Sequence, residues 1–324
     1  MFNLAWARGL LQWAYALAAR YLSANRCPSF SIRLFSPMTL RFLVVEGNVR
    51  ESREGFRAAY GRTPSESYAD VLQHLARDAI CDIAFPADEG ANLPDPAGLE
   101  SYDGVVLTGS GLNVYDGGPA IERQIELMRA VYKSKTPAFG SCWGIQIGAV
   151  AAGGQVTKNV RGREINIARN IAPTEAGLNH PLLAGRARAY DAPCSHIDHV
   201  TGLPGDVTVL ASNSISAVQA AEIRHDGGVF WGVQYHPEFD LRTMAIILRR
   251  YGDGLIREGF FKDAHDRDRY ADDMDLLHED PYRADVAWRM GIGADILDPI
   301  VRRTELTNFI THRVRPTQSA RGRA

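Results

Sequence analysis

A cysteine framed by small residues is the first candidate for chemistry in this chain. Cys142 stands in the sequence Gly140-Ser141-Cys142-Trp143-Gly144, directly after a short apolar segment and directly before a run of small, helix-compatible residues. This order predicts a nucleophile elbow, in which glycines tolerate a tight strand-to-helix turn that projects the central side chain into a cleft. The start of the helix would favour the nucleophilic thiolate form of the cysteine. The alternative is a buried structural cysteine that happens to lie between glycines.

A histidine and a carboxylate two residues apart form the second candidate. His236-Pro237-Glu238 follows the apolar segment 228–234. Histidine is a base near neutral pH, and the proline keeps its neighbours extended, so the two side chains point to the same side. Glu238 is then able to bond one imidazole nitrogen while the other faces a thiol. This predicts a triad in the chain order Cys, His, Glu, the alternative being a surface turn.

Both candidates need a scaffold that brings segments far apart in the sequence to one edge. Apolar runs alternate with helix-like patterns up to residue 152, and this alternation predicts an α/β fold with an open, mostly parallel sheet flanked by helices. The region 155–234 changes to short strands with turns, which adds an antiparallel portion. The predicted strands are 41–46, 79–85, 104–108, 136–140, 207–211, 217–223 and 228–234, and the predicted helices are 64–77, 119–134, 143–152 and 240–258. Open α/β sheets bind ligands at the carboxyl ends of their strands, where both candidates lie.

Composition places the chain among ordinary globular proteins. It has 324 residues, 45% of them hydrophobic, and a formal net charge of -2. This charge gives no general attraction to nucleic acid or to an anionic membrane, so we expect neither as a partner. The four cysteines form no CxxC pair, which favours a cytoplasmic protein without disulfides.

Four segments are expected along the chain. Residues 1–37 are basic and contain no acidic residue, and we interpret them either as codons upstream of a true start at Met38 or as a targeting segment. Residues 38–260 form the main domain, and residues 261–313 a charged, helical C-terminal extension. The basic, polar residues 314–324 are expected to be a disordered tail.

Four motifs in matching order give residues 41–258 a specific resemblance. Gly140 to Gln146 match G-x-C-x-G-x-Q, and Gln234 to Glu238 match Q-[FY]-H-P-E. The strand ending in Thr108-Gly109-Ser110-Gly111 matches an oxyanion loop, and Cys194 to Val200 are similar to an S-H-x-D-x-V stretch. The chain therefore resembles the flavodoxin-like class I (triad-type) glutamine amidotransferases, most of all the glutaminase domain of GMP synthetase and its stand-alone relatives.

The resemblance implies a role for each matched residue. Cys142 would attack the glutamine side-chain amide to give a γ-glutamyl thioester and ammonia, His236 would transfer protons, and Glu238 would orient the imidazole. Backbone N–H groups of Gly109, Ser110 and Trp143 would form the oxyanion hole. The residues implied to bind the substrate are Gln146, Gly111, Ser195, Ile197 and Asp198. The position of Ile197 is often glycine in relatives, so an altered pocket is expected there.

Two other site types receive less support. Cys194, His196, Asp198 and His199 offer metal-ligand side chains, but no second cluster with ligand spacing accompanies them. The glycines at 109–111 and 117–118 suggest a phosphate loop, yet GK[ST] is missing. We therefore expect no metal and no cofactor.

Three functions remain open from the sequence. The preferred one is a free-standing glutaminase that releases ammonia for an unidentified acceptor, with a synthetase partner chain, because no SGGxDS motif is present. The second is a γ-glutamyl peptidase or hydrolase with the same triad, and the third is a non-catalytic binding protein on the same scaffold. We also consider the C-terminal extension as a partner-docking or homodimer element.

Overall fold

A nine-stranded mixed sheet forms the centre of the protein. The structure is a computed structural model that describes residues 39–203 and 205–323, so the expected extension 1–37 lies outside the described residues. The strand order is β2-β1-β3-β4-β11-β10-β9-β6-β7, and β5 and β8 form a separate two-stranded sheet. The strands are β1 (Arg41–Val45), β2 (Ile80–Ala84), β3 (Gly104–Leu107), β4 (Ala138–Ser141), β5 (Gln155–Lys158), β6 (Glu164–Pro173), β7 (Tyr190–His196), β8 (Asp198–Gly202), β9 (Val207–Ser212), β10 (Ala220–His225) and β11 (Gly228–Val233).

The sheet changes from parallel to antiparallel at β11. From β2 to β11 every neighbouring pair is parallel, and from β11 to β7 every pair is antiparallel. Phe42 and Val44 of β1 are buried against one face of the sheet and Leu43 and Val45 against the other, as continuous apolar strands of a covered parallel sheet require. The expected α/β class with an antiparallel addition and C-terminal helices is confirmed.

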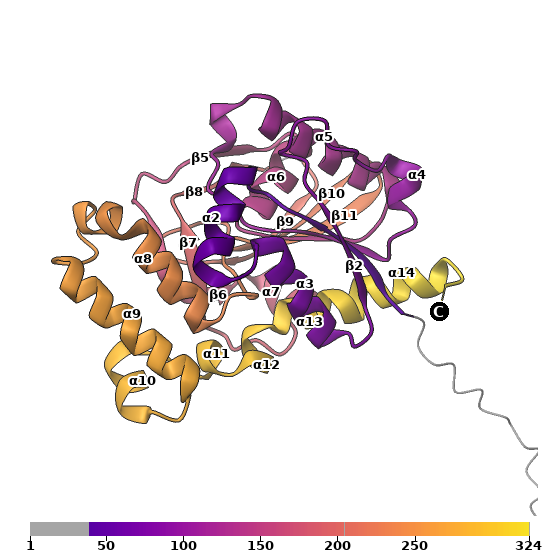
Figure 1. Cartoon of the computed structure of the whole chain (residues 1–324). Coiled ribbons are helices and arrows are strands. Elements are labelled where there is room, and N and C mark those ends of the chain that lie inside the picture. The colour runs from indigo at the N-terminus through magenta and orange to yellow at the C-terminus, as the bar shows by residue number, and fades with distance from the viewer. Residues whose placement is uncertain (1–38, 204, 324) are drawn as a thin grey trace, which may run out of the picture. The chain divides into compact units, whose positions relative to one another are not determined.

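Helices cover both faces of the sheet (Figure 1). Helices α4, α5 and α6 pack on the face of Leu43, and α3 and α13 pack on the face of Phe42. A third cluster joins α8, α9, α10 and α11 to Ile167 of β6. The helices are α2 (Arg50–Tyr60), α3 (Pro64–Leu75), α4 (Pro96–Leu99), α5 (Pro119–Ser134), α6 (Trp143–Ala151), α7 (Glu175–Leu178), α8 (Leu241–Arg257), α9 (Ala264–Glu279), α10 (Ala284–Met290), α11 (Ala294–Leu297), α12 (Pro299–Arg302), α13 (Thr304–Phe309) and α14 (Arg315–Ala320), with a π-helix at Ile310–Val314.

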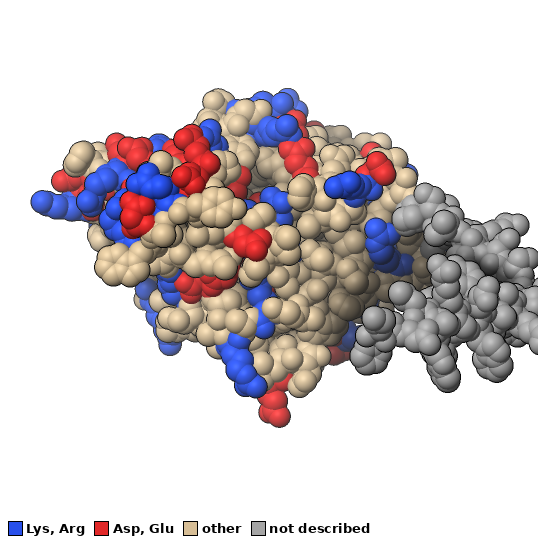
Figure 2. Space-filling view, turned by 90° about the horizontal axis from the view of Figure 1, so that it is seen from below, with Lys and Arg blue, Asp and Glu red and all other residues tan. Residues whose placement is uncertain are grey.

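Two helices are rich in charged residues. Helix α2 was not expected from the sequence, and α9 lies in the charged, helical extension expected at residues 261–313. Charged side chains do gather at the end of the protein that α9 and α10 form (Figure 2). However, α9 buries Ala271, Met274 and Leu277 at a spacing of three residues, which gives it a narrow apolar stripe among the charges.

The C-terminal segment departs most from expectation. The predicted disordered tail contains α14, and Val314 just before it is fully buried. Arg321 donates to the backbone carbonyls of Glu100, Tyr102 and Ser134, so its positive charge serves docking to the domain. The basic composition of this segment predicted side chains exposed to solvent, but the Arg321 guanidinium instead bonds backbone carbonyls of the domain.

The expected boundary at residue 260 is likewise wrong as a division between packed units. Leu306, Phe309 and Ile310 lie in the same core cluster as β1 and α3. Residues 39–203 and 205–323 form one compact unit, so the C-terminal helices are part of the domain core. Among residues 39–203 and 205–323, no helix combines the length and apolar character that crossing a lipid bilayer requires.

The parallel strands bring the candidate residues to one edge. Strands β3, β4 and β11 are neighbours and run in the same direction, with Leu107 opposite Gly140 and Ser141 opposite Val233. Their carboxyl ends therefore meet, and the segments that follow them, at Gly109, Cys142 and His236, lie side by side.

Candidate active site

Cys142 occupies a strained turn between β4 and α6. Its φ and ψ of 52° and -101° are unusual for a residue with a side chain, and such a conformation costs about 1–3 kcal/mol. The Cys142 N–H is held by the carbonyl of Val233 at 2.8 Å. A Cβ on Gly140 would lie 2.7 Å from the Gly144 backbone, and one on Gly144 would lie 2.9 Å from the Leu107 carbonyl oxygen. Glycine is therefore required on both sides of the elbow.

His236 and Glu238 form a buried pair beside this turn. Nδ1 of His236 donates to Oε1 of Glu238 at 2.7 Å, and the imidazole stacks on the Phe239 ring with centroids 3.9 Å apart and planes within 3°. The His236 N–H donates to the Pro193 carbonyl at 2.7 Å. These contacts fix the ring in position and in plane, and leave Nε2 free to face the cysteine.

The electrostatic surroundings favour a protonated His236. Burial alone would lower the pKa of this imidazole, but the Glu238 carboxylate and a hydrogen bond with the Cys142 side chain outweigh burial and raise the pKa of His236 to about 10. The arrangement is thus suited to an imidazolium between a sulfur and a carboxylate.

A second set of buried hydroxyl groups supports Glu238. The Ser141 hydroxyl donates to Oε2 of Glu238 at 2.8 Å and lies 3.1 Å from the Tyr68 hydroxyl. Both residues are almost completely buried. Each oxygen of Glu238 therefore has its own donor, which keeps the carboxylate from rotating away from His236.

Asn48, after β1, organises the loop that follows β3. Its amide accepts from the Gly111 N–H at 3.3 Å and donates to the Gly109 carbonyl at 3.2 Å and to Glu46 at 2.8 Å. The Gly111 N–H is thus already engaged. Trp143, the first residue of α6, has no intrahelical acceptor for its N–H, as helix geometry dictates.

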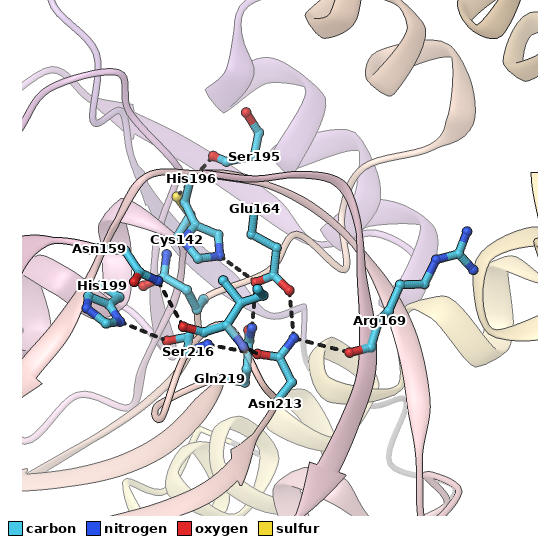
Figure 3. A network of polar contacts seen from close by, with 12 residues as sticks. Cys142, Asn159, Glu164, Arg169, Ser195, His196, His199, Asn213, Ser216 and Gln219 are labelled. Atoms are coloured by element: carbon cyan, nitrogen blue, oxygen red, sulfur yellow. Dashed lines mark hydrogen bonds and ion pairs between the residues drawn. The ribbon is translucent and has the colours of Figure 1, made fainter. Parts of the chain in front are cut away.

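The end of β7 and the start of β8 contact the elbow. The Cys142 thiol donates to the Ser195 carbonyl at 3.7 Å, and the Gln146 amide donates to the Asp198 carbonyl at 3.1 Å. Behind this segment, Glu164 accepts from His196 at 2.9 Å (Figure 3).

Glu164 is the centre of the network in Figure 3. Asn213 and Gln219 also donate to it, at 2.6 Å and 2.7 Å. Burial would raise the pKa of Glu164, but the bonds from these three side chains outweigh burial and lower it. The anion is thereby fixed under the 195–198 segment.

The side chains around His196 that could bind a metal are engaged in other contacts. The two ring nitrogens of His196 face Glu164 and the Asp198 carbonyl, and burial raises the pKa of the Cys194 thiol. Within residues 39–203 and 205–323, no group of three or more such side chains is arranged to hold a metal ion.

Two hollows meet at Cys142. The α2–α8 hollow, of about 670 Å³, is lined among others by Phe56, Tyr68, Phe239, Ile247 and Arg250. The β7–β8 hollow, of about 560 Å³, is lined among others by Asn113, Gln146, Arg163, Ile197 and Asp198. Both hollows share Ser110, Gly111, Cys142, Ser195 and Tyr251.

The structure brings the residues expected from the sequence together. Those lining a hollow are Cys142, His236, Glu238, Gly109, Ser110, Gly111, Gln146, Ser195, Ile197 and Asp198. The Trp143 side chain points into the core, where its indole N–H donates to Gln124 at 2.7 Å. Asn48, Ser141, Tyr68 and Arg250 were not foreseen. Ser141 carried a signal, since it precedes the cysteine in the elbow, whereas the other three come from segments distant in sequence.

The chain is similar in sequence to several γ-glutamyl hydrolases and GMP synthases. Over 281 residues it is 34% identical to the γ-glutamyl-L-1-hydroxyisopropylamide hydrolase of a Pseudomonas species, spanning 86% of this chain and 94% of that protein. It is 27% identical over 177 residues to γ-glutamyl peptidase 3 of Arabidopsis thaliana, spanning 53% of this chain and 68% of that protein. The GMP synthase of Symbiobacterium thermophilum matches at 34% over 128 residues, 39% of this chain and 24% of that enzyme.

Fold and family comparisons agree with these relatives. A solved glutamine amidotransferase from Thermotoga maritima superposes with a TM-score of 0.59 at 20% identity, covering 85% of this chain and 98% of that one. The model of the family described as glutamine amidotransferase class-I matches residues 67–250. The chain therefore belongs to the class I glutamine amidotransferase family and is an amide hydrolase of that family.

Proposed function

We propose that this protein hydrolyses γ-glutamyl amides of amines larger than ammonia. The observation that carries this proposal is the 34% identity to a γ-glutamyl amide hydrolase along 94% of that protein's length. The γ-glutamyl hydrolase, which the sequence placed second, is thus favoured over the glutaminase that supplies ammonia to a synthetase. The match to GMP synthase covers about a quarter of that enzyme, so it supports a common fold more than a common reaction.

In this proposal Cys142 is the nucleophile and His236 the proton carrier. The thiol proton passes to Nε2 of His236, because Nδ1 is engaged by Glu238. The sulfur adds to the γ-carbonyl carbon, and the imidazolium protonates the leaving amine as the C–N bond breaks. Water, deprotonated by His236, then attacks the γ-glutamyl thioester and releases glutamate and the free thiol.

Two backbone N–H groups would stabilise the oxyanion. We assign this role to Trp143 and to Gly109 or Ser110, which flank Cys142. Loss of one such donor typically raises the barrier by about 2.7–4 kcal/mol.

The two hollows suit the two halves of the substrate. We place the γ-glutamyl group in the β7–β8 hollow, where Gln146, Ser195 and Asp198 supply polar groups beside Ile197. The α2–α8 hollow also reaches Cys142 and is lined in part by the apolar side chains of Phe56, Phe239 and Ile247, which ammonia would not contact. This space supports a leaving amine with a substituent.

A direct kinetic comparison tests the proposal. Purified full chain is assayed with γ-glutamyl isopropylamide and with glutamine, and Cys142→Ala serves as the inactive control. We expect kcat/KM to be at least about tenfold higher for the alkylamide, because filling an apolar site with three carbons contributes roughly 1.5–3 kcal/mol. Glutamine turnover that equals or exceeds alkylamide turnover would refute the proposal and restore the ammonia-releasing glutaminase.

A further inference from the structure

Arg250 stands at the α2–α8 hollow without an ion-pair partner. It is exposed on α8, and its guanidinium carbon lies 5.8 Å from the centre of the Phe56 ring. No carboxylate of the described residues forms a salt bridge with it. The adjacent Arg249 differs, because it pairs with Asp272 and Asp275 of α9 at 2.6 Å and 2.8 Å.

The His236–Glu238 pair and Arg163, which lie near the sulfur, already have charged partners. Glu238 accepts from His236 and Ser141. At the β7–β8 hollow, Arg163 bonds both carboxylate oxygens of Glu258, at 2.8 Å and 3.1 Å. Among the described residues that line the α2–α8 hollow, Arg250 is therefore the one charged side chain outside the His236–Glu238 pair.

The walls around Arg250 are apolar and aromatic. Phe56 of α2, Phe239 after β11 and Ile247 of α8 line the same hollow. A group that fits here has an apolar body and an anionic end, because the guanidinium lacks a counter-charge from the described residues.

We infer that Arg250 binds a carboxylate on the leaving amine, so that the preferred substrates are γ-glutamyl amides of apolar amino acids. This inference rests on the proposed function and names its substrate class. In such an amide the carboxylate is one carbon away from the scissile nitrogen, next to Cys142. The planar guanidinium can bind its two oxygens with two parallel N–H···O bonds. Hydrolysis then releases glutamate and a free amino acid.

A pair of substrates that differ in charge alone tests this inference. We would measure kcat/KM for γ-glutamyl-alanine and for its neutral C-terminal amide in wild type, Arg250→Gln, Arg250→Lys and Arg249→Gln. Because hydrogen bonds between charged groups are stronger than those to a neutral amide, wild type should prefer the acid by about tenfold or more. The preference should fall to near unity in R250Q and survive in part in R250K. It should stay at the wild-type value in R249Q, whose neighbouring arginine is paired with α9.

The outcomes separate this inference from the proposed function. Equal rates on the acid and the amide in wild type, or an unchanged preference in R250Q, overturn the role of Arg250 while γ-glutamyl amide hydrolysis stands. Hydrolysis of glutamine with neither γ-glutamyl-alanine compound turned over overturns the proposed function as well.

Discussion

A single methyl group on Gly109 should disable the enzyme by pushing His236 out of place. A Cβ at this position would lie 2.6 Å from Cε1 of His236. The imidazole must move by roughly 0.8 Å to reach ordinary van der Waals separation. It has nowhere to retreat, because Phe239 stacks on the ring at 3.9 Å and Glu238 holds Nδ1 at 2.7 Å.

The expected loss follows from this displacement. Moving a catalytic group by about 1 Å typically costs about 100-fold in rate, so we expect kcat of Gly109→Ala to fall about 100-fold. The assay is γ-glutamyl amide hydrolysis, with the thermal midpoint Tm measured in parallel. Gly111→Ala is the matched comparison in the same loop, since its Cβ would meet no atom closer than the Tyr251 hydroxyl at 3.7 Å. Its loss should be far smaller. Activity of Gly109→Ala within threefold of wild type, at equal Tm, would refute the reasoning.

Three further changes test other parts of the structure. Glu238→Gln removes the carboxylate that helps to raise the pKa of His236 to about 10, so the alkaline decline of kcat/KM, near pH 10 in wild type, should move to lower pH. Folding raises the pKa of His236 above its ordinary value of 6.5, so the His236–Glu238 pair stabilises the protein fully below pH 6.5. This contribution is lost as the pH rises through about 10, and the Tm difference between wild type and Glu238→Gln should shrink over the same range. Ser141→Ala deletes a buried donor to Glu238 and should lower the free energy of unfolding in urea by about 1.5–3 kcal/mol. A chain ending at residue 298 loses Leu306, Phe309, Ile310 and Val314, each worth about 1.5–3 kcal/mol, and should show no cooperative thermal transition.

Each of these expectations has a contrary result. An alkaline limb at the same pH in Glu238→Gln would mean that another group controls it. Unchanged stability of Ser141→Ala would show that the hydroxyl does not bond Glu238 in solution. Cooperative unfolding of the shortened chain would show that the C-terminal helices are a separate extension and not part of the core.

The sequence predicts the elbow and the His-Pro-Glu segment well because both are local. Glycines around Cys142 restrict the turn directly, and the proline between His236 and Glu238 fixes their relative direction. Each arm also follows an apolar strand, so the parallel sheet that those strands imply brings the two together.

The supporting residues could not be predicted because their contacts join distant segments. Tyr68 reaches Ser141 across 73 positions, and Asn48 reaches Gly111 across 63. Arg250 looks like an ordinary charged residue on an amphipathic helix until α2 is placed beside α8. Helix α2 has few apolar residues and gave no clear pattern, so the hollow between these helices was not foreseen.

The wrong prediction of a disordered C-terminal tail also arose because the contacts of this segment join distant parts of the sequence. Composition described residues 314–324 as basic and polar, yet the arginines there bond backbone carbonyls of the loops that precede β3 and β4. Propensity and charge carry no information about such acceptors. Packing of Phe309 against Phe139 and Trp231 is likewise a long-range property.

Trapping the acyl-enzyme tests the central claim most directly. Purified full chain is mixed with a γ-glutamyl alkylamide and quenched in acid during turnover, and the peptide containing Cys142 is analysed by mass spectrometry. The account predicts a γ-glutamyl adduct on Cys142 in wild type, increased in Glu238→Gln if deacylation slows more than acylation, and absent in Cys142→Ala together with all turnover. Turnover that persists in Cys142→Ala, or an adduct on another residue, would contradict it.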